Sequence, residues 1–138
     1  MLSLQTNNLG NIRVSSSYKW HGQIGEKNGF VVFDSLENGL RALLMLLFNY
    51  YRKHKCYNVD QITARYAPAS ENNLGRYRLA VRSVLPDNMK WRNLALDEMK
   101  YIAVGIIFAE TSIKFPLSVL NEIREKYIYL DGTLKPCV

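Results

Sequence analysis

Three carboxylates stand where acid–base chemistry would be possible, and Glu110 is the first. It follows a strongly apolar run that ends at Ala109. A carboxylate at the C-terminal end of a buried helix is desolvated and faces the negative end of the helix dipole, and both effects favour its protonated form. That environment suits a general acid near neutral pH. The alternative interpretation is a helix-end residue turned to solvent.

Glu71 and Glu26 are the other two candidates. Glu71 opens a predicted helix, where the dipole favours an ionised carboxylate and therefore a base or an electrostatic stabiliser. Acidic residues are also common in first helical turns for structural reasons alone. Glu26 lies in a predicted turn, and a solvated loop residue is the simpler interpretation there. We therefore take Glu110 and Glu71 as the candidate catalytic pair, with Glu26 as the substitute for either.

Amide and aromatic side chains gather in the N-terminal quarter of the chain. They are Asn8, Asn11, Tyr18, Trp20, Gln23 and Asn28. Amides can bond to sugar hydroxyls, and aromatic rings can pack on the apolar faces of sugar rings. Asparagine and glycine are equally typical of turns. The region is therefore either a sugar-binding surface or simply a turn-rich hairpin.

Other chemistries have little support in the sequence. His21 and His54 lie in different predicted elements, and neither neighbours a recognised nucleophile motif. We find no P-loop, no dinucleotide-binding glycine motif and no zinc-ligand spacing, and the segment from Gly22 to Gly25 reads as a turn. We expect no cofactor and no metal.

Composition indicates one folded domain, residues 1–138. The hydrophobic fraction is 48% and the charged fraction is 22%, as in ordinary globular proteins. The net charge of +6 favours polyanionic partners without choosing among them. Basic residues are scattered, and the small cluster at 52–55 reads as a solvated helix end. We therefore expect no nucleic-acid partner. We also expect the protein to be a monomer.

Two features of the sequence bear on where in the cell the protein is made and acts. The first residues lack the basic start and apolar stretch of a signal peptide. The apolar stretch from Leu40 to Tyr51 is too short to span a bilayer. We expect no membrane association and synthesis in the cytoplasm. Action outside the cell would then need delivery by other machinery.

Turn and cap signals divide the chain into elements. Strands are predicted at Ile12–Ser15 and Phe30–Phe33. A helix apolar on nearly every face, and therefore central, runs from Leu36 to about His54 after a cap at Asp34 or Ser35. Further helices follow caps at Asn58, Ser70 and Asn93, the last running from about Leu94 to Ala109, and one more spans about Pro116 to Tyr127. The fold class is α+β, mainly α: a small N-terminal antiparallel β region packed on a helical bundle.

Several short motifs then occur in one order. They are Asn7-Asn8-Leu9-Gly10-Asn11-Ile12-Arg13, Trp20-His21-Gly22-Gln23, Gly39-Leu40-Arg41-Ala42, and Arg65-Tyr66-Ala67-Pro68 with Ser70-Glu71-Asn72 and Tyr77. The chain thereby resembles a family of phage and prophage virion structural proteins, which is associated with lysozyme-like degradation of the cell wall. The resemblance covers about residues 7–82 and, more loosely, the helix that ends at Glu110.

The resemblance implies a lysozyme-like domain that cleaves the glycan strands of peptidoglycan, as a lysozyme or a lytic transglycosylase does. Glu110 would protonate the departing oxygen, and Glu71 would assist as base or stabiliser. The implied substrate-binding residues are Asn8, Asn11, Arg13, Trp20, Gln23, Asn72 and Tyr77. The protein would act at the bacterial cell wall after delivery by a virion, a holin or a secretion machine.

Several positions depart from the family pattern. Leu9 and Ala69 stand where the family has proline, and Leu74 stands where it has threonine. Around Glu110, the family's His-Glu-Asn-Gly is Ala109-Glu110-Thr111-Ser112 in this chain. These departures motivate an alternative function, a non-catalytic virion or secretion-associated protein that only holds glycan.

Overall fold

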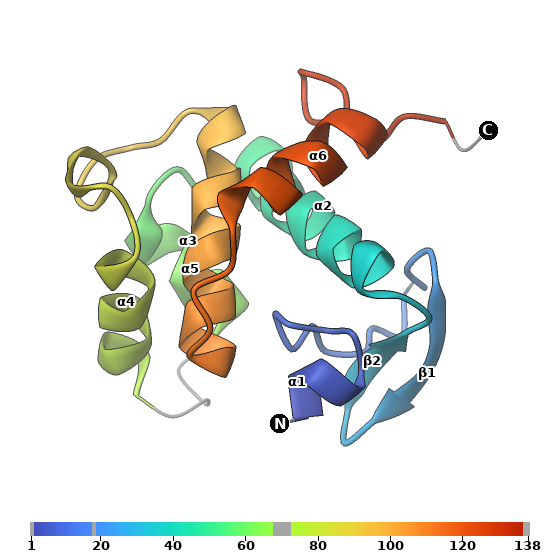
Figure 1. The fold of residues 1–138 in the computed structure, drawn as a ribbon. Coiled ribbons are helices and arrows are strands. Elements are labelled where there is room, and N and C mark those ends of the chain that lie inside the picture. Colours follow the sequence, from blue (N-terminus) through green and yellow to red (C-terminus); the bar gives the residue numbers. More distant parts are fainter. Residues whose placement is uncertain (1, 18, 68–72, 137–138) are drawn as a thin grey trace.

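The computed structural model describes residues 2–17, 19–67 and 73–136. The chain is mainly helical, with a small two-stranded antiparallel sheet near its N-terminus (Figure 1), which confirms the mainly helical α+β class. The described elements are α1 (Leu2–Gln5), β1 (Gln23–Lys27), β2 (Phe30–Phe33), α2 (Leu36–His54), α3 (Val59–Tyr66), α4 (Leu74–Ser83), η1 (Asp87–Met89), η2 (Leu96–Glu98), α5 (Met99–Thr111) and α6 (Leu117–Tyr127). The predicted cap Ser70 and the predicted site residues Glu71 and Asn72 lie outside the described residues.

Helix α2 has the bounds that its sequence predicts. Of the two candidate caps, Ser35 is the one used, because its side chain accepts the backbone N–H of Asn38 at 3.2 Å. Asp34 instead accepts the side-chain amide of Asn38 at 2.8 Å. The helix ends at Lys55, which adopts the left-handed conformation. Figure 1 shows α2 running diagonally through the molecule, with α6 lying across it and the sheet beside its N-terminal end.

Helix α5 is the second central helix. Met99, Ile102 and Ile106 are completely buried. Gly105 lets α4 approach closely, because a Cβ there would lie 2.7 Å from Cγ1 of Val81. The predicted start at Leu94 was too early. The backbone N–H of Leu94 donates to the carbonyl of Tyr57 at 2.7 Å, and a separate 3₁₀ turn, η2, precedes α5.

The predicted N-cap of α3, Asn58, is confirmed, whereas the prediction that Ser70 caps the next helix, α4, is wrong. Asn58 caps α3 by accepting the backbone N–H of Gln61 at 2.9 Å. Helix α4 is capped by Asn73, whose side chain accepts the N–H of Arg76 at 3.1 Å. Asparagine tolerates the left-handed backbone that this position adopts, and its short amide reaches the first turn.

The β region differs from its prediction. Ile12–Ser15 is not a strand, because only Arg13 pairs, through an isolated bridge to Phe30. The first strand is instead β1, which includes residues interpreted above as a turn. Asn28 and Gly29 both have positive φ, at 55° and 83°, and they connect β1 to β2 as a tight hairpin. That turn, rather than the Ile12 segment, sets the strand pairing.

The segment 7–12 is clamped between the hairpin and α2. A Cβ on Gly39 of α2 would lie 1.8 Å from the backbone oxygen of Asn7. The fully buried Asn8 amide donates to the carbonyls of Ile12 at 3.0 Å and Val31 at 2.9 Å, and its oxygen accepts the N–H of Ile12 at 2.9 Å. Asn8, expected to bind sugar, therefore has its amide committed to the fold.

Candidate functional site

Asn11 and Glu110 meet at the C-terminal end of α5. The Asn11 side-chain amide donates to Oε1 of Glu110 at 3.0 Å. Both side chains are partly buried. Asn11 has a φ of 51°, and this left-handed turn aims its side chain out of the clamped segment 7–12. The bond unites two predicted site residues that are 99 positions apart in the chain.

Tyr66, the last residue of α3, packs beside this pair. Its hydroxyl donates to the carbonyl of Gly10 at 2.5 Å. Gly10 has to be glycine for this contact, because a Cβ would lie 2.5 Å from the same hydroxyl. Burial, and then the charges of Glu110 and Tyr50, raise the pKa of Tyr66 well above its ordinary value. Tyr66 is therefore a neutral hydrogen-bond donor at physiological pH.

Tyr77 of α4 is the second neutral phenol near Glu110. Burial raises its pKa far above the ordinary value, and the neighbouring Tyr66 and Glu110 raise it further. The hydroxyl is buried and has no hydrogen bond of ordinary geometry among the described residues, although the Glu110 carboxylate is close enough to perturb it. The fold thus brings together the predicted residues Asn11, Tyr77 and Glu110. It also places beside them Tyr66, which was not a predicted site residue.

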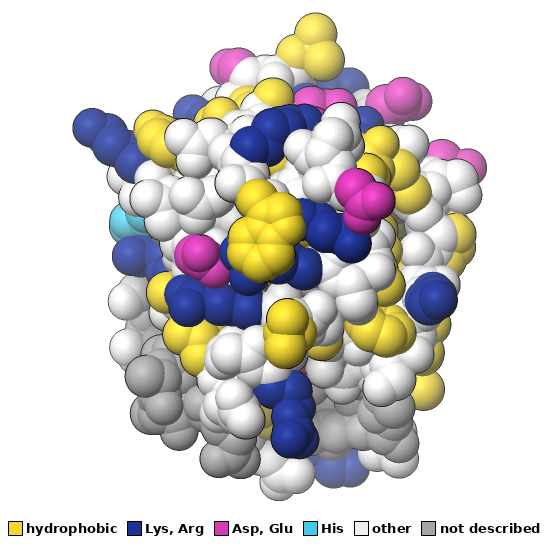
Figure 2. Space-filling view, turned by 90° about the vertical axis from the view of Figure 1, so that its left-hand side faces the viewer, with side chains coloured by type: hydrophobic (Ala, Val, Ile, Leu, Met, Phe, Trp, Pro, Cys, Tyr) yellow, Lys and Arg dark blue, Asp and Glu magenta, His cyan; other side chains and the backbone are white. Residues whose placement is uncertain are grey.

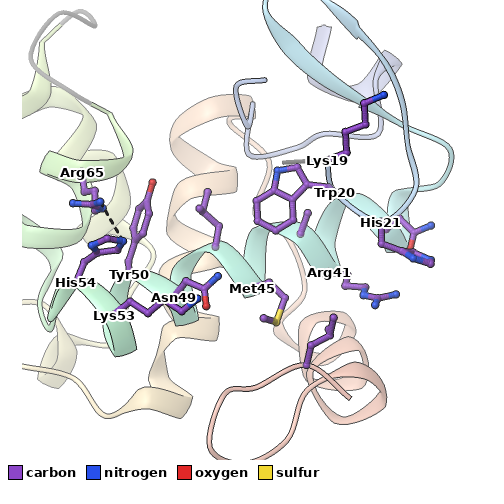
Figure 3. A pocket seen from close by; sticks show the side chains of 14 residues that line it. Lys19, Trp20, His21, Arg41, Met45, Asn49, Tyr50, Lys53, His54 and Arg65 are labelled. Carbon is purple, nitrogen blue, oxygen red and sulfur yellow. Dashed lines mark hydrogen bonds between the residues drawn. The ribbon is translucent and has the colours of Figure 1, made fainter. Parts of the chain in front are cut away.

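A cavity of about 680 Å³ lies along α2. Figure 3 shows the aromatic side chains of Trp20 and Tyr50 on the same side of the helix, with His54 and Arg65 together at one end. Six basic or imidazole side chains line this cavity, namely Lys19, His21, Arg41, Lys53, His54 and Arg65. The size is typical of a ligand pocket. Among the described residues, Trp20 is the one predicted sugar-binding residue that lines it.

Gln23 and Arg13, two other predicted substrate-binding residues, do not line the cavity. The side-chain oxygen of Gln23 accepts the N–H of Trp20 at 3.0 Å, and the Gln23 N–H donates to the Trp20 carbonyl at 3.0 Å. Gln23 therefore fixes the turn that presents Trp20 to the cavity. Arg13 is exposed beside the hairpin, with its guanidinium 4.8 Å from the centre of the Phe30 ring.

The cavity and the Glu110 cluster are neighbours rather than one space. Glu110 does not line the cavity. The ring of Tyr50, which does, meets the ring of Tyr66 edge-on, with centroids 6.4 Å apart. One layer of aromatic side chains thus stands between the cavity and the residues around Glu110.

The remaining candidates give a mixed outcome. Glu26 is exposed on β1, opposite Val31 in the hairpin. Glu71 and Asn72 lie outside the described residues, so their relation to Glu110 stays a prediction. Within the described residues, no group of three histidine, cysteine, aspartate or glutamate side chains has an arrangement that would hold a metal ion. No helix in this part of the chain is long and apolar enough to cross a membrane.

The basic charge on the α4 side of the molecule is broken up by acidic partners. Figure 2 shows separate Lys and Arg side chains on this face, with acidic side chains among them. Arg82 pairs with Asp60 at 2.8 Å, and Lys90 pairs with Asp87 at 2.9 Å. The cavity differs, because no aspartate or glutamate is among its described lining residues.

Apart from Trp20, sequence reasoning missed the residues that build this cavity. Tyr50 lies within the apolar run of α2 and reads as core, while His54 reads as a solvated helix end. Arg65 lies on α3, and its guanidinium reaches His54 only because α3 folds back beside α2. A helical projection of α2 would have placed Tyr50 and His54 on one face, since they are four residues apart.

The arrangement offers a half-buried carboxylate, two neutral phenols beside it, and a cation-rich cavity with aromatic walls next to them. These groups can transfer a proton and can hold a ligand that has both apolar faces and polar groups. In comparisons with known proteins, no family model and no curated protein matches this chain.

Proposed function

We propose that this protein is a lysozyme-like domain that cleaves the glycan strands of bacterial peptidoglycan, as a lysozyme or a lytic transglycosylase does. The observation that carries the proposal is the meeting of Asn11 and Glu110 at the end of a buried helix. It places a carboxylate where a helical core, a small sheet and a ligand-sized cavity adjoin. The protein would reach the cell wall by way of a virion, a holin or a secretion machine.

Glu110 is the proposed general acid. Its proton would pass to the departing glycosidic oxygen, while Asn11 fixes the orientation of the carboxyl group through Oε1. Tyr66 and Tyr77 stay neutral, so they add no negative charge near the reacting sugar. Glu71 is the proposed base or stabiliser of positive charge on the sugar ring. The glycan would lie along α2, against Trp20 and Tyr50, and cleavage would require the contact between Tyr50 and Tyr66 to open toward Glu110.

A second candidate function is glycan binding without cleavage. It is favoured by the separation of Glu110 from the cavity, across the contact between Tyr50 and Tyr66. In that case the cavity would bind the sugar chain, and Glu110 would only tie the segment 7–12 to α5.

Incubation of the purified protein with insoluble peptidoglycan distinguishes the two functions. Cleavage predicts release of soluble sugar fragments, and a loss of about 100-fold or more in Glu110→Gln, as for a general acid. Glu122→Gln, an exposed residue of α6, is the matched control and should retain full activity. The variants Glu71→Gln and Glu26→Gln, tested in parallel, identify the second catalytic carboxylate as the one whose loss also reduces fragment release.

Two results would refute cleavage. One is the absence of released fragments from the folded wild-type protein. The other is undiminished release by both Glu71→Gln and Glu110→Gln. Co-sedimentation with peptidoglycan without turnover would establish the binding function instead.

A further inference from the structure

The cavity along α2 is lined by several cationic side chains and, among the described residues, by no carboxylate. Lys53, His54 and Arg65 form one end of it, and all three side chains are exposed. Among the described residues, no carboxylate forms an ion pair with any of the three, whereas each of four basic residues on the α4 side does, namely Arg78, Arg82, Lys90 and Arg92. Within the described residues, this end of the cavity therefore has no acidic partner.

Contacts with each other and with Tyr50 hold His54 and Arg65 in place, and no described carboxylate takes part. Nη2 of Arg65 lies 3.2 Å from Nε2 of His54, and since a guanidinium can only donate, the imidazole nitrogen accepts. The Arg65 guanidinium also lies 5.3 Å from the centre of the Tyr50 ring, and His54 meets that ring edge-on. A cation fixed in this way by neutral partners retains its capacity to bind an anion.

The other walls of the cavity are suited to a sugar. Trp20 and Tyr50 offer aromatic surface, and Asn49 adds an amide between them along α2. Aromatic faces and amides suit the ring faces and hydroxyls of a saccharide, while the cationic end requires a negative group on the same ligand.

We propose that this cavity binds an acidic glycan, with Lys53, His54 and Arg65 recognising a carboxylate carried by the sugar chain. The inference rests on the proposed function in that it names the feature of the glycan that the site selects. It predicts that a carboxylate-bearing strand binds more tightly than a neutral strand of the same backbone.

Calorimetric titration in the Glu110→Gln background tests this binding without turnover. The probes are chitotetraose, which is neutral, and the peptide-free peptidoglycan tetrasaccharide, whose lactyl groups end in free carboxylates. The acidic sugar should bind about fivefold or more tightly, and the difference should shrink between 50 and 300 mM NaCl, because exposed charge pairs are screened. Arg65→Gln and Lys53→Gln should each reduce the difference, and the double variant should abolish it.

Lys27→Gln is the matched control. It removes the same charge from the exposed end of β1, away from the cavity, and should retain the preference. Equal affinity for the two sugars would overturn the inference. So would tighter binding of a ten-nucleotide oligo-dT that is lost in the same variants, because the cavity would then serve nucleic acid. Since only binding is measured, an inactive wild type would refute the cleavage proposal and leave this one standing.

Discussion

The Asn11 side chain donates to Oε1 of Glu110 at 3.0 Å and joins the N-terminal segment to the end of α5. The left-handed backbone at Asn11, with φ of 51°, makes the contact possible. Asparagine and glycine are the residues that adopt this conformation most readily. Position 11 therefore requires a permissive backbone as well as an amide.

Asn11→Gly separates these two requirements, because it keeps the backbone and removes the amide. We expect a loss of about 1 kcal/mol in the free energy of unfolding, measured by urea denaturation, together with reduced fragment release. Asn11→Asp keeps the shape but replaces the donor by a carboxylate facing Glu110. It should lose more stability at pH 7 than Asn11→Gly, and the opposite order would contradict the proposed hydrogen bond.

Gly39→Ala should be strongly destabilising. The added Cβ would lie 1.8 Å from the backbone oxygen of Asn7, so the segment 7–12 would have to move off α2. We expect a loss of about 2 kcal/mol or more in the free energy of unfolding. Gly25→Ala is the control, because nothing lies within 4 Å of its added Cβ and its φ is not positive. It should change stability by less than about 0.5 kcal/mol. Similar effects from the two variants would refute the close packing.

Asn8→Ala tests whether Asn8 serves the fold or the ligand. It removes the amide that bonds to two buried carbonyls and one buried N–H, and of these the Ile12 carbonyl keeps the Val31 N–H. We expect a loss of about 2–3 kcal/mol in the free energy of unfolding. At a temperature where the variant stays folded, the affinity for chitotetraose should match that of the wild type. Weaker sugar binding by a protein of unchanged stability would restore the original prediction that Asn8 contacts substrate.

Local chemistry made much of the helical framework predictable. Ser35 and Asn58 are caps that bond to the nearby turn, and Pro116 immediately precedes α6, so each signal lies within a few residues of its effect. The start of α5 failed because Leu94 bonds to Tyr57, a residue brought near by the fold. The predicted strand at Ile12–Ser15 was wrong for a related reason. The buried Asn8 side chain bonds to both the N–H and the carbonyl of Ile12.

The candidate site was predictable only in part. The motifs pointed to Asn11, Tyr77 and Glu110, and the structure brings these three together. The roles of Tyr66 and of the cationic end of the cavity could not be predicted from the sequence, because they depend on how α3 lies against α2. His54 and Arg65 are 11 residues apart and have no shared periodicity that would predict their contact.

The two buried phenols predict a particular response to alkaline pH. Burial, with the nearby Glu110 charge, raises the pKa of both Tyr66 and Tyr77 above the ordinary value of 10.0. Above about pH 10 the unfolded chain loses these protons while the folded protein keeps them, so the folded state binds more protons. Stability should therefore be fully present below pH 10 and fall as the pH rises beyond it.

Tyr77→Phe removes one of the two groups and should make this decline shallower. The free energy of unfolding, measured by urea denaturation from pH 8 to 11.5, should fall less steeply by up to about 1.4 kcal/mol per pH unit, the value for one proton. Tyr129→Phe is the control, because Tyr129 is 47% exposed, and it should keep the wild-type decline. A decline in Tyr77→Phe as steep as that of the wild type would show that the Tyr77 hydroxyl is not held protonated beside Glu110.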